Sequence, residues 1–399
     1  MKNDFCINKR SNVCRLNYNE MIFTISYGCL LISFMLSIST LPNEFGQLYS
    51  IMRYLKIIGY ATAILKILHQ KFIKKQVILI VIIGVVFLVT SIQSNETTFV
   101  SAFLLISASR GIDFRKIVKT DLFIRIMLTC LFIILSTNGI IENRLEYRSG
   151  ILTRASLGFS HPNRFALNIF IICLYWTYLR HNMFKLRDFI GIISLLVFME
   201  IIAGGRSSMI SIISLLIFEV SNTLIKDKKL KSAIRKYFIK VSYFAATLFF
   251  LLSYLLSYLY NSSSMFLETL NQLFNTRIYL AHIAIMQYGI KFSGQTIEYI
   301  SLITSRQTGV ESNGIDNMYI YLGITFGIIV LVIYYCSIIL IIREAKKRNE
   351  YIIIICLFIV FICGIMENQF LAIESNIFLL YLGKVMFKNN FHIGENVHE

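Results

Sequence analysis

Long apolar runs alternate with short polar segments along almost the whole chain. A run of about 20 apolar residues is long enough to cross the roughly 30 Å hydrocarbon core of a bilayer as a helix. We therefore expect twelve spanning helices, the fourth of them short, and both termini on one side of the membrane. The spans lie near residues 21–41, 48–66, 77–93, 97–109, 121–141, 165–180, 188–203, 208–225, 238–259, 316–342, 351–366 and 369–387.

Composition supports the same fold class. Of the 399 residues 56% are hydrophobic, and the mean hydropathy is +0.67. The pattern predicts an all-α, polytopic membrane bundle that forms a single multi-pass domain over residues 1–399. The first 20 residues are polar and basic, and the first apolar run is too long for the core of a signal peptide, so we expect no cleavable signal peptide.

The distribution of positive charge predicts the orientation. The formal net charge is +17, and 28 of the 39 Lys and Arg fall in one alternate set of connections and termini. An excess of Lys and Arg marks the cytoplasmic side, so we expect this set and both termini to be cytoplasmic. Because topology explains these charges, we expect membrane lipid and no nucleic acid as their partner. The set comprises residues 1–20, 66–76, 109–120, 180–188, 226–240, 343–350 and 384–399.

The opposite, outer side carries few cations, and nearly all of them are arginine. The positive-inside rule disfavours these positions, so topology does not account for them. A planar guanidinium suits carboxylate or phosphate oxygens, and the outer face is therefore predicted to bind an anion. The outer cations are Arg144, Arg148, Arg154, Arg164, Arg206, Arg277, Lys291 and Arg306.

Two of the predicted outer loops are long, about 141–164 and 260–315. Loops of this size within a compact bundle are usually functional. The second loop has apolar residues at helical spacing, which predicts interfacial helices lying on the membrane surface. These residues are Phe266, Leu267, Leu270, Leu273, Phe274 and Ile278.

The ionisable residues on the outer face suggest a particular chemistry. No zinc-protease, serine-esterase, P-loop or paired-carboxylate metal motif occurs, and the eight cysteines lack metal-ligand spacing, so we expect no metal and no cofactor. Arginines can hold an anionic diphosphate leaving group while a base activates a hydroxyl group. The candidate anion-binding residues are Arg164, Arg206 and Arg277, and the candidate bases are His161, Asp316 and Glu367.

Five segments in this order resemble the Wzy-type polysaccharide polymerases, which share a superfamily with O-antigen ligases. The segments are LGFSHPNRF (157–165), AGGRSSMISI (203–212), LFNTRIYLA (273–281), GIDNMYIYLGITFGI (314–328) and MENQFLAIESNIFLL (366–380). The resemblance implies a GT-C-like fold in a bacterial cytoplasmic (inner) membrane. It also implies metal-independent transfer of a glycan chain between undecaprenyl-diphosphate-linked oligosaccharides on the outer face, for O-antigen (lipopolysaccharide) or capsule, with a chain-length regulator and a flippase as partners.

The resemblance also implies residue roles. Arg206 and Arg277 would bind the donor diphosphate, and Asp316 would occupy the place of a histidine in the ligases. Structural roles compete with these: His161 and Asp316 are also suited to cap helices, Arg164 to snorkel to the interface, and Glu367 to form a polar turn. The rival functions are an O-antigen ligase and a flippase for lipid-linked oligosaccharide, although helix interiors almost free of charge argue against a flippase.

Overall fold

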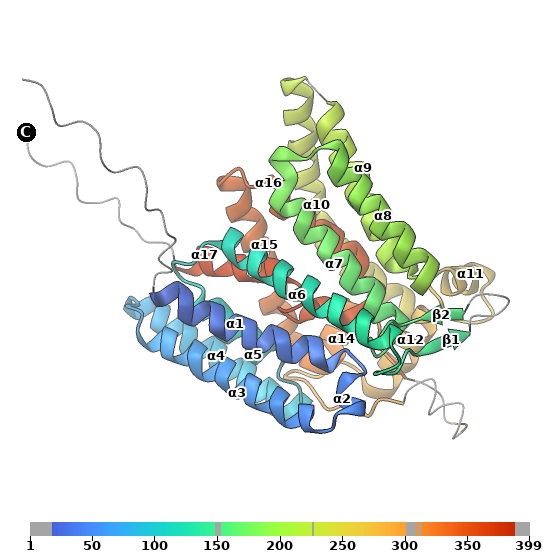
Figure 1. Cartoon of the computed structure of the whole chain (residues 1–399), viewed down its shortest axis with the longest axis horizontal. Coiled ribbons are helices and arrows are strands. Elements are labelled where there is room, and N and C mark those ends of the chain that lie inside the picture. The colour runs from blue at the N-terminus through green and yellow to red at the C-terminus, as the bar shows by residue number, and fades with distance from the viewer. Residues whose placement is uncertain (1–17, 148–152, 226, 301–308, 310–312, 388–399) are drawn as a thin grey trace, which may run out of the picture.

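A computed structural model describes residues 18–147, 153–225, 227–300, 309 and 313–387, and most of these residues are helical (Figure 1). The first half contains α1 (Tyr18–Ser37), α2 (Leu41–Glu44), α3 (Gln47–Leu68), α4 (Lys74–Ser94), α5 (Thr98–Ala108), α6 (Phe114–Thr137), α7 (Pro162–Arg180), η1 (His181–Met183) and α8 (Leu186–Ala203). The second contains α9 (Arg206–Leu224), α10 (Lys228–Tyr258), α11 (Met265–Leu273), α12 (Arg277–Tyr288), α14 (Met318–Tyr321), η2 (Leu322–Phe326), α15 (Gly327–Lys347), α16 (Tyr351–Gly364), η3 (Asn368–Leu371), η4 (Ile377–Tyr381) and α17 (Leu382–Met386).

The all-α class is confirmed, with one small exception. In the described part of the chain the only sheet is an antiparallel hairpin of β1 (Leu145–Tyr147) and β2 (Thr153–Ala155), which lies in the first long outer loop. The expected helices of the second long loop are present as α11 and α12.

Several helices have the length and composition of membrane spans. Within the described ranges five qualify by these criteria, and shorter apolar helices accompany them. Helices also occupy the remaining predicted spans up to residue 364, while the total of twelve crossings stays a prediction. The five are Tyr18–Ser37, Lys74–Ser94, Arg206–Leu224, Lys229–Tyr258 and Met318–Lys347.

The predicted span near 369–387 is not a single helix. This segment is buried but broken into η3, a turn at residues 373–375, η4 and α17. Irregular backbone is tolerated at such depth only where protein groups satisfy it. Arg125 donates to the Glu374 carbonyl oxygen, and the Ile377 amide donates to Tyr175 Oη at 3.2 Å. The sequence shows an apolar run here, but the partners that break it come from α6 and α7.

Arg125, which lies inside a predicted span, is fully buried. Its Nε lies 2.8 Å from Asp121 Oδ1 one turn earlier, and its Nη1 donates to Asn168 Oδ1 at 3.0 Å. Tyr27 also donates to Asp121, so α1, α6 and α7 meet at one polar network. Burying a charge pair costs free energy unless the remaining hydrogen-bonding groups of both side chains also find partners. In this network Asn168, Tyr27 and the Glu374 carbonyl oxygen are such partners.

The helices are ordered around α7, which is buried along nearly its whole length. It packs against α6 on one side and against α8 and α9 on the other, and α16 lies between α9, α10 and α15. By contrast, α4 exposes most of its apolar side chains, including Ile78, Ile82 and Ile92. Exposed apolar surface of this extent is expected to face lipid.

Contacts join several of the connections to one another at the ends of the helices. At one end Thr40 bonds to the Glu142 carbonyl oxygen, and Thr296 bonds to the Gln93 carbonyl oxygen. At the other end Lys116 pairs with Glu20, and Lys384 lies 3.7 Å from Glu350. In Figure 1 α2, α11, α12 and the hairpin gather at the first end. We call this the outer end, following the charge prediction.

Candidate functional site

Three helices begin at the outer end with an arginine in their first turn. Arg206 is the first residue of α9, Arg277 is the first residue of α12, and Arg164 lies in the first turn of α7. Helix N-termini carry partial positive charge and unpaired amide groups. The outer end therefore has helix dipoles and guanidinium groups of the same sign, which favours anions.

Arg277 forms the centre of a charged cluster with Asp316, Glu367 and Ser207, which we call the Arg277 cluster. The Arg277 side chain is only 10% exposed, and its Nη2 donates to Glu367 Oε1 at 3.4 Å. Its Nε lies 3.2 Å from Asp316 Oδ2 without the alignment of a hydrogen bond, so this buried donor remains unsatisfied. An unsatisfied buried donor on a cation is costly and can be relieved by a bound acceptor.

Glu367 is buried beneath the arginine. Besides Arg277, its Oε1 accepts a hydrogen bond from Ser207 Oγ at 2.9 Å. Burial raises the pKa of the Glu367 carboxyl above its ordinary value, although the Arg277 guanidinium opposes this rise. The cluster thus joins the first turns of α9 and α12 to the segment after α16, which are far apart in the sequence.

Asp316 occupies the solvent side of the cluster, with a side chain that is 50% exposed. It does not cap the next helix. Asn317 does so instead, because its Oδ1 accepts from the amides of Tyr319 and Ile320 at 2.9 and 3.1 Å. The Asp316 carboxylate is therefore available both to Arg277 and to a molecule arriving from outside.

The backbone before Arg277 adopts an unusual conformation. Asn275 and Thr276 have φ angles of +51° and +63°, in the left-handed region, which asparagine tolerates but a β-branched residue such as Thr276 rarely occupies. Strain of this kind costs about 1–3 kcal/mol per residue and concentrates at functional sites. Here it directs the chain so that Arg277 starts α12 while Asn275 Oδ1 accepts from Arg206 Nη1 at 3.3 Å.

A close helix contact holds Arg206 in place. Gly204 ends α8 with φ +53°, and a Cβ added to Gly205 would lie 2.4 Å from the Cβ of Ala166 in α7. Glycine at 205 is thus required for α9 to begin against α7. The Arg206 side chain itself is exposed, which suits contact with a ligand.

Arg164 is the third arginine of this end. It is partly buried and lies close enough to Glu367 and Asp316 to interact with both carboxylates electrostatically. The structure therefore brings together Arg164, Arg277, Asp316 and Glu367, with Arg206 linked to them through Asn275.

The contacts of His161 differ from those of the other candidates. Its Nδ1 accepts a hydrogen bond from the Asn163 amide at 2.9 Å, so the ring caps α7. Its Nε2 lies 2.6 Å from Glu146 Oε1 in the hairpin. Since Nδ1 is an acceptor, the neutral ring carries its proton on Nε2 and donates it to Glu146. Both nitrogens are thus engaged, and a base needs a free lone pair.

Two contributing residues are not among the candidates predicted from the sequence. Ser207, in the AGGRSSM segment, has no sequence signal that marks it as a partner for Glu367. Arg154 is predicted only as an outer cation, but it joins three elements. It donates to the Ala203 carbonyl oxygen and to Asn163 Oδ1, and its Nη1 lies 3.5 Å from Glu146. Arg154 lies on the predicted outer side, where the positive-inside rule disfavours cations, and this is the sequence signal that marks it as a functional candidate.

An apolar cavity of about 150 Å³ opens beside Arg277, and we call it the outer cavity. Arg277 and Asn317 supply polar groups to its wall. The remaining wall is formed mainly by apolar side chains of α10 and α12. These helices contribute Phe249, Leu252, Leu256 and Ile278, while Phe274 follows α11 and Ile365 follows α16. Ser253 and Ser257 of α10 also line the cavity.

The described residues contain no group of three or more His, Cys, Asp or Glu side chains that could hold a metal ion. No protein-family model, no curated protein and no solved structure matches this chain.

Proposed function

We propose that this protein is a polysaccharide polymerase that joins undecaprenyl-diphosphate-linked repeat units at the outer face of the bacterial cytoplasmic membrane. The observation that carries the proposal is the position of Arg277. A buried guanidinium with an unsatisfied donor lies between two carboxylates and beside an apolar cavity. A lipid diphosphate has the same two parts, an anionic headgroup and an apolar tail.

The donor would bind with its diphosphate between Arg277 and Arg206 and the start of its isoprenoid chain in the outer cavity. The N-termini of α9 and α12 add partial positive charge on the same side. These groups stabilise the negative charge that develops on the leaving diphosphate, and stabilisation of this kind supplies most of the rate enhancement in many enzymes. Arg164 contributes more distant positive charge.

Asp316 is the base that we assign. The acceptor hydroxyl oxygen attacks the anomeric carbon of the donor sugar and forms the new glycosidic bond. The bond from that carbon to the diphosphate oxygen breaks, and the diphosphate leaves with the electron pair. Asp316 takes the proton of the hydroxyl group. Its exposed carboxylate can reach an acceptor, whereas Glu367 is buried and positions Arg277.

The experiment is a comparison of glycan length in cells that lack the gene and are complemented with matched membrane levels of each variant. Wild type, Arg206→Ala, Arg206→Lys and Asp316→Asn are compared with Arg144→Lys as a control. Arg144 is an outer arginine that pairs with Glu142 at 2.9 Å, away from the Arg277 cluster. We expect wild type and the control to restore long chains, and the other variants to leave single repeat units.

The same experiment separates the rival functions. A ligase is indicated if loss of the gene leaves long chains on the lipid carrier and none on the final acceptor. A flippase is indicated if single units accumulate on the cytoplasmic leaflet, and that result contradicts the assigned site as well. The Arg206→Lys variant should transfer glycan about 100-fold more slowly than wild type. A lysine ammonium group cannot donate two parallel hydrogen bonds to the diphosphate oxygens, as an arginine guanidinium can.

A further inference from the structure

A second, larger cavity lies at the opposite end of the bundle, between α9, α10 and α16. Its volume is about 250 Å³, and we call it the inner groove. Most of its wall is apolar. This apolar part is formed by Ile217, Phe218, Ile234, Phe238, Ile354 and Ile355.

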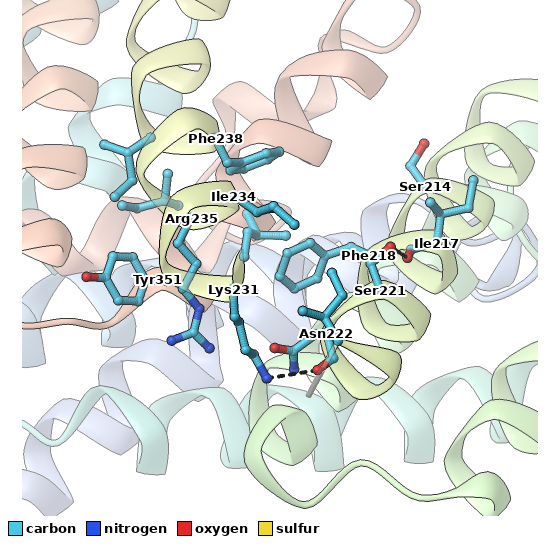
Figure 2. Close-up of a pocket in the computed structure, with 14 residues that line it drawn as sticks. Ser214, Ile217, Phe218, Ser221, Asn222, Lys231, Ile234, Arg235, Phe238 and Tyr351 are labelled. Carbon is cyan, nitrogen blue, oxygen red and sulfur yellow. Dashed lines mark hydrogen bonds between the residues drawn. The ribbon is translucent and has the colours of Figure 1, made fainter. Parts of the chain in front are cut away.

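The mouth of the inner groove is polar and basic. Figure 2 shows Lys231 and Arg235 at the same end of the groove, beside Asn222 and Tyr351. Lys231 Nζ donates to the Asn222 carbonyl oxygen at 2.8 Å, and the Arg235 guanidinium lies 5.2 Å from the centre of the Tyr351 ring. The groove thus combines two cations at its mouth with an apolar interior.

No carboxylate neutralises these two cations among the described residues. Glu219, on the neighbouring face of α9, is engaged by His181 Nδ1 at 2.6 Å. Glu350, which precedes Tyr351, lies 3.7 Å from Lys384. Asp227, one turn before Lys231, caps α10, and its carboxylate accepts from the Lys229 amide at 2.8 Å. The Asn222 carbonyl oxygen and the Tyr351 ring carry no charge. The charge at the mouth of the groove therefore favours an anion.

The length of α10 places this mouth at headgroup depth. Its 31 residues extend to about 46 Å at 1.5 Å per residue, well beyond the roughly 30 Å hydrocarbon core. About ten residues must therefore lie outside the core. The basic residues are concentrated in the first turns, so it is the N-terminal part of α10, with Lys231 and Arg235, that reaches the lipid phosphates.

From this geometry we propose that the inner groove binds one anionic glycerophospholipid of the inner leaflet. Its phosphate contacts Lys231 and Arg235, and an acyl chain lies against Phe218, Phe238 and Ile217. Basic sites between helices on the cytoplasmic side are suited to anionic lipid headgroups. The apolar wall beside these cations favours a lipid over a free phosphate ion, because only a lipid has an acyl chain to place against it. This inference stands whether or not the proposed function is correct.

The test measures lipid retention on the purified full-length protein by native mass spectrometry, with phosphatidylglycerol and phosphatidylcholine as probes. The variants are Lys231→Gln, Arg235→Gln and the double variant. Lys236→Gln is the matched control, because Lys236 is an exposed cation on the same helix that does not line the groove. Lys231 and Arg235 are partly exposed, so glutamine at these positions should leave the core intact, and the unfolding temperature of each variant verifies this.

We expect wild type and Lys236→Gln to retain phosphatidylglycerol in preference to phosphatidylcholine. Each groove variant should weaken this preference about fivefold, and the double variant about 25-fold. Equal retention of both lipids by wild type overturns the proposal, as does equal loss in Lys236→Gln. It is also overturned if undecaprenyl phosphate displaces phosphatidylglycerol at stoichiometric amounts. A Ser221→Cys variant that cross-links to a second copy likewise overturns it, because the groove is then a subunit interface.

Discussion

Replacing Arg277 tests whether this residue binds substrate or only neutralises a buried carboxylate. Its guanidinium contacts both Glu367 and Asp316 and is 10% exposed. If it stabilises charge on a leaving diphosphate, Arg277→Ala should lower the rate of glycan transfer by about 100- to 1,000-fold, as the loss of one preorganised donor typically does. Arg277→Lys should recover little of this loss.

The same substitution also affects the fold. It leaves Glu367 buried with Ser207 as its remaining hydrogen-bond partner. Removing one partner of a buried charge pair can cost about 3–5 kcal/mol. Burial already raises the pKa of the Glu367 carboxyl, so this group can take up a proton. We therefore expect the smaller cost of an incompletely bonded polar group, about 1–3 kcal/mol.

Combining Arg277→Ala with Glu367→Gln separates the two effects. The glutamine has the shape of the glutamate without its charge and can still accept a hydrogen bond from Ser207. We expect the double variant to regain most of the lost thermal stability and none of the lost activity. The assay is the length of glycan formed from lipid-linked repeat units in vesicles, at matched protein levels and with Arg144→Ala as a control.

A double variant with wild-type glycan length would refute the reasoning. Arg277 would then serve only to compensate Glu367, and the donor site would have to lie elsewhere. An Arg277→Ala variant that loses stability but keeps full activity leads to the same conclusion. A variant with wild-type stability and no activity would instead support direct contact with substrate.

Three further outcomes follow from the same geometry. Gly205→Ala should destabilise the fold by about 1–3 kcal/mol, because the added Cβ would meet Ala166. Gly191→Ala is the control and should not destabilise it, since no atom lies near the added Cβ. The unfolding temperatures of the two variants test both expectations. Thr276→Gly should raise the unfolding temperature by relieving a φ of +63°. Because burial raises the pKa of Glu367, the folded protein binds this proton more tightly than the unfolded chain. Its contribution to stability therefore falls as pH rises from 4.5 through the raised value, and Glu367→Gln should remove that slope.

The amino-acid sequence by itself determined the class of the protein and the separation of its two ends. Apolar runs of spanning length require helices, because backbone groups inside a bilayer must bond to one another. The uneven distribution of lysine and arginine divides the connections into two sets, and the orientation that it implies stays a prediction. The outer arginines were visible because they violate the same rule. Helices in the long second loop followed from apolar spacing alone.

Only the tertiary structure decided which of these residues act together. Arg277 and Glu367 are 90 positions apart and come into contact only when α12 packs against the segment that follows α16. The capping role of His161 depends on the orientation of its ring toward Asn163 and Glu146. The break in the last apolar segment depends on Arg125 from α6. Such partners lie far away in sequence, so local pattern and charge could identify the candidates but not the pairs that they form.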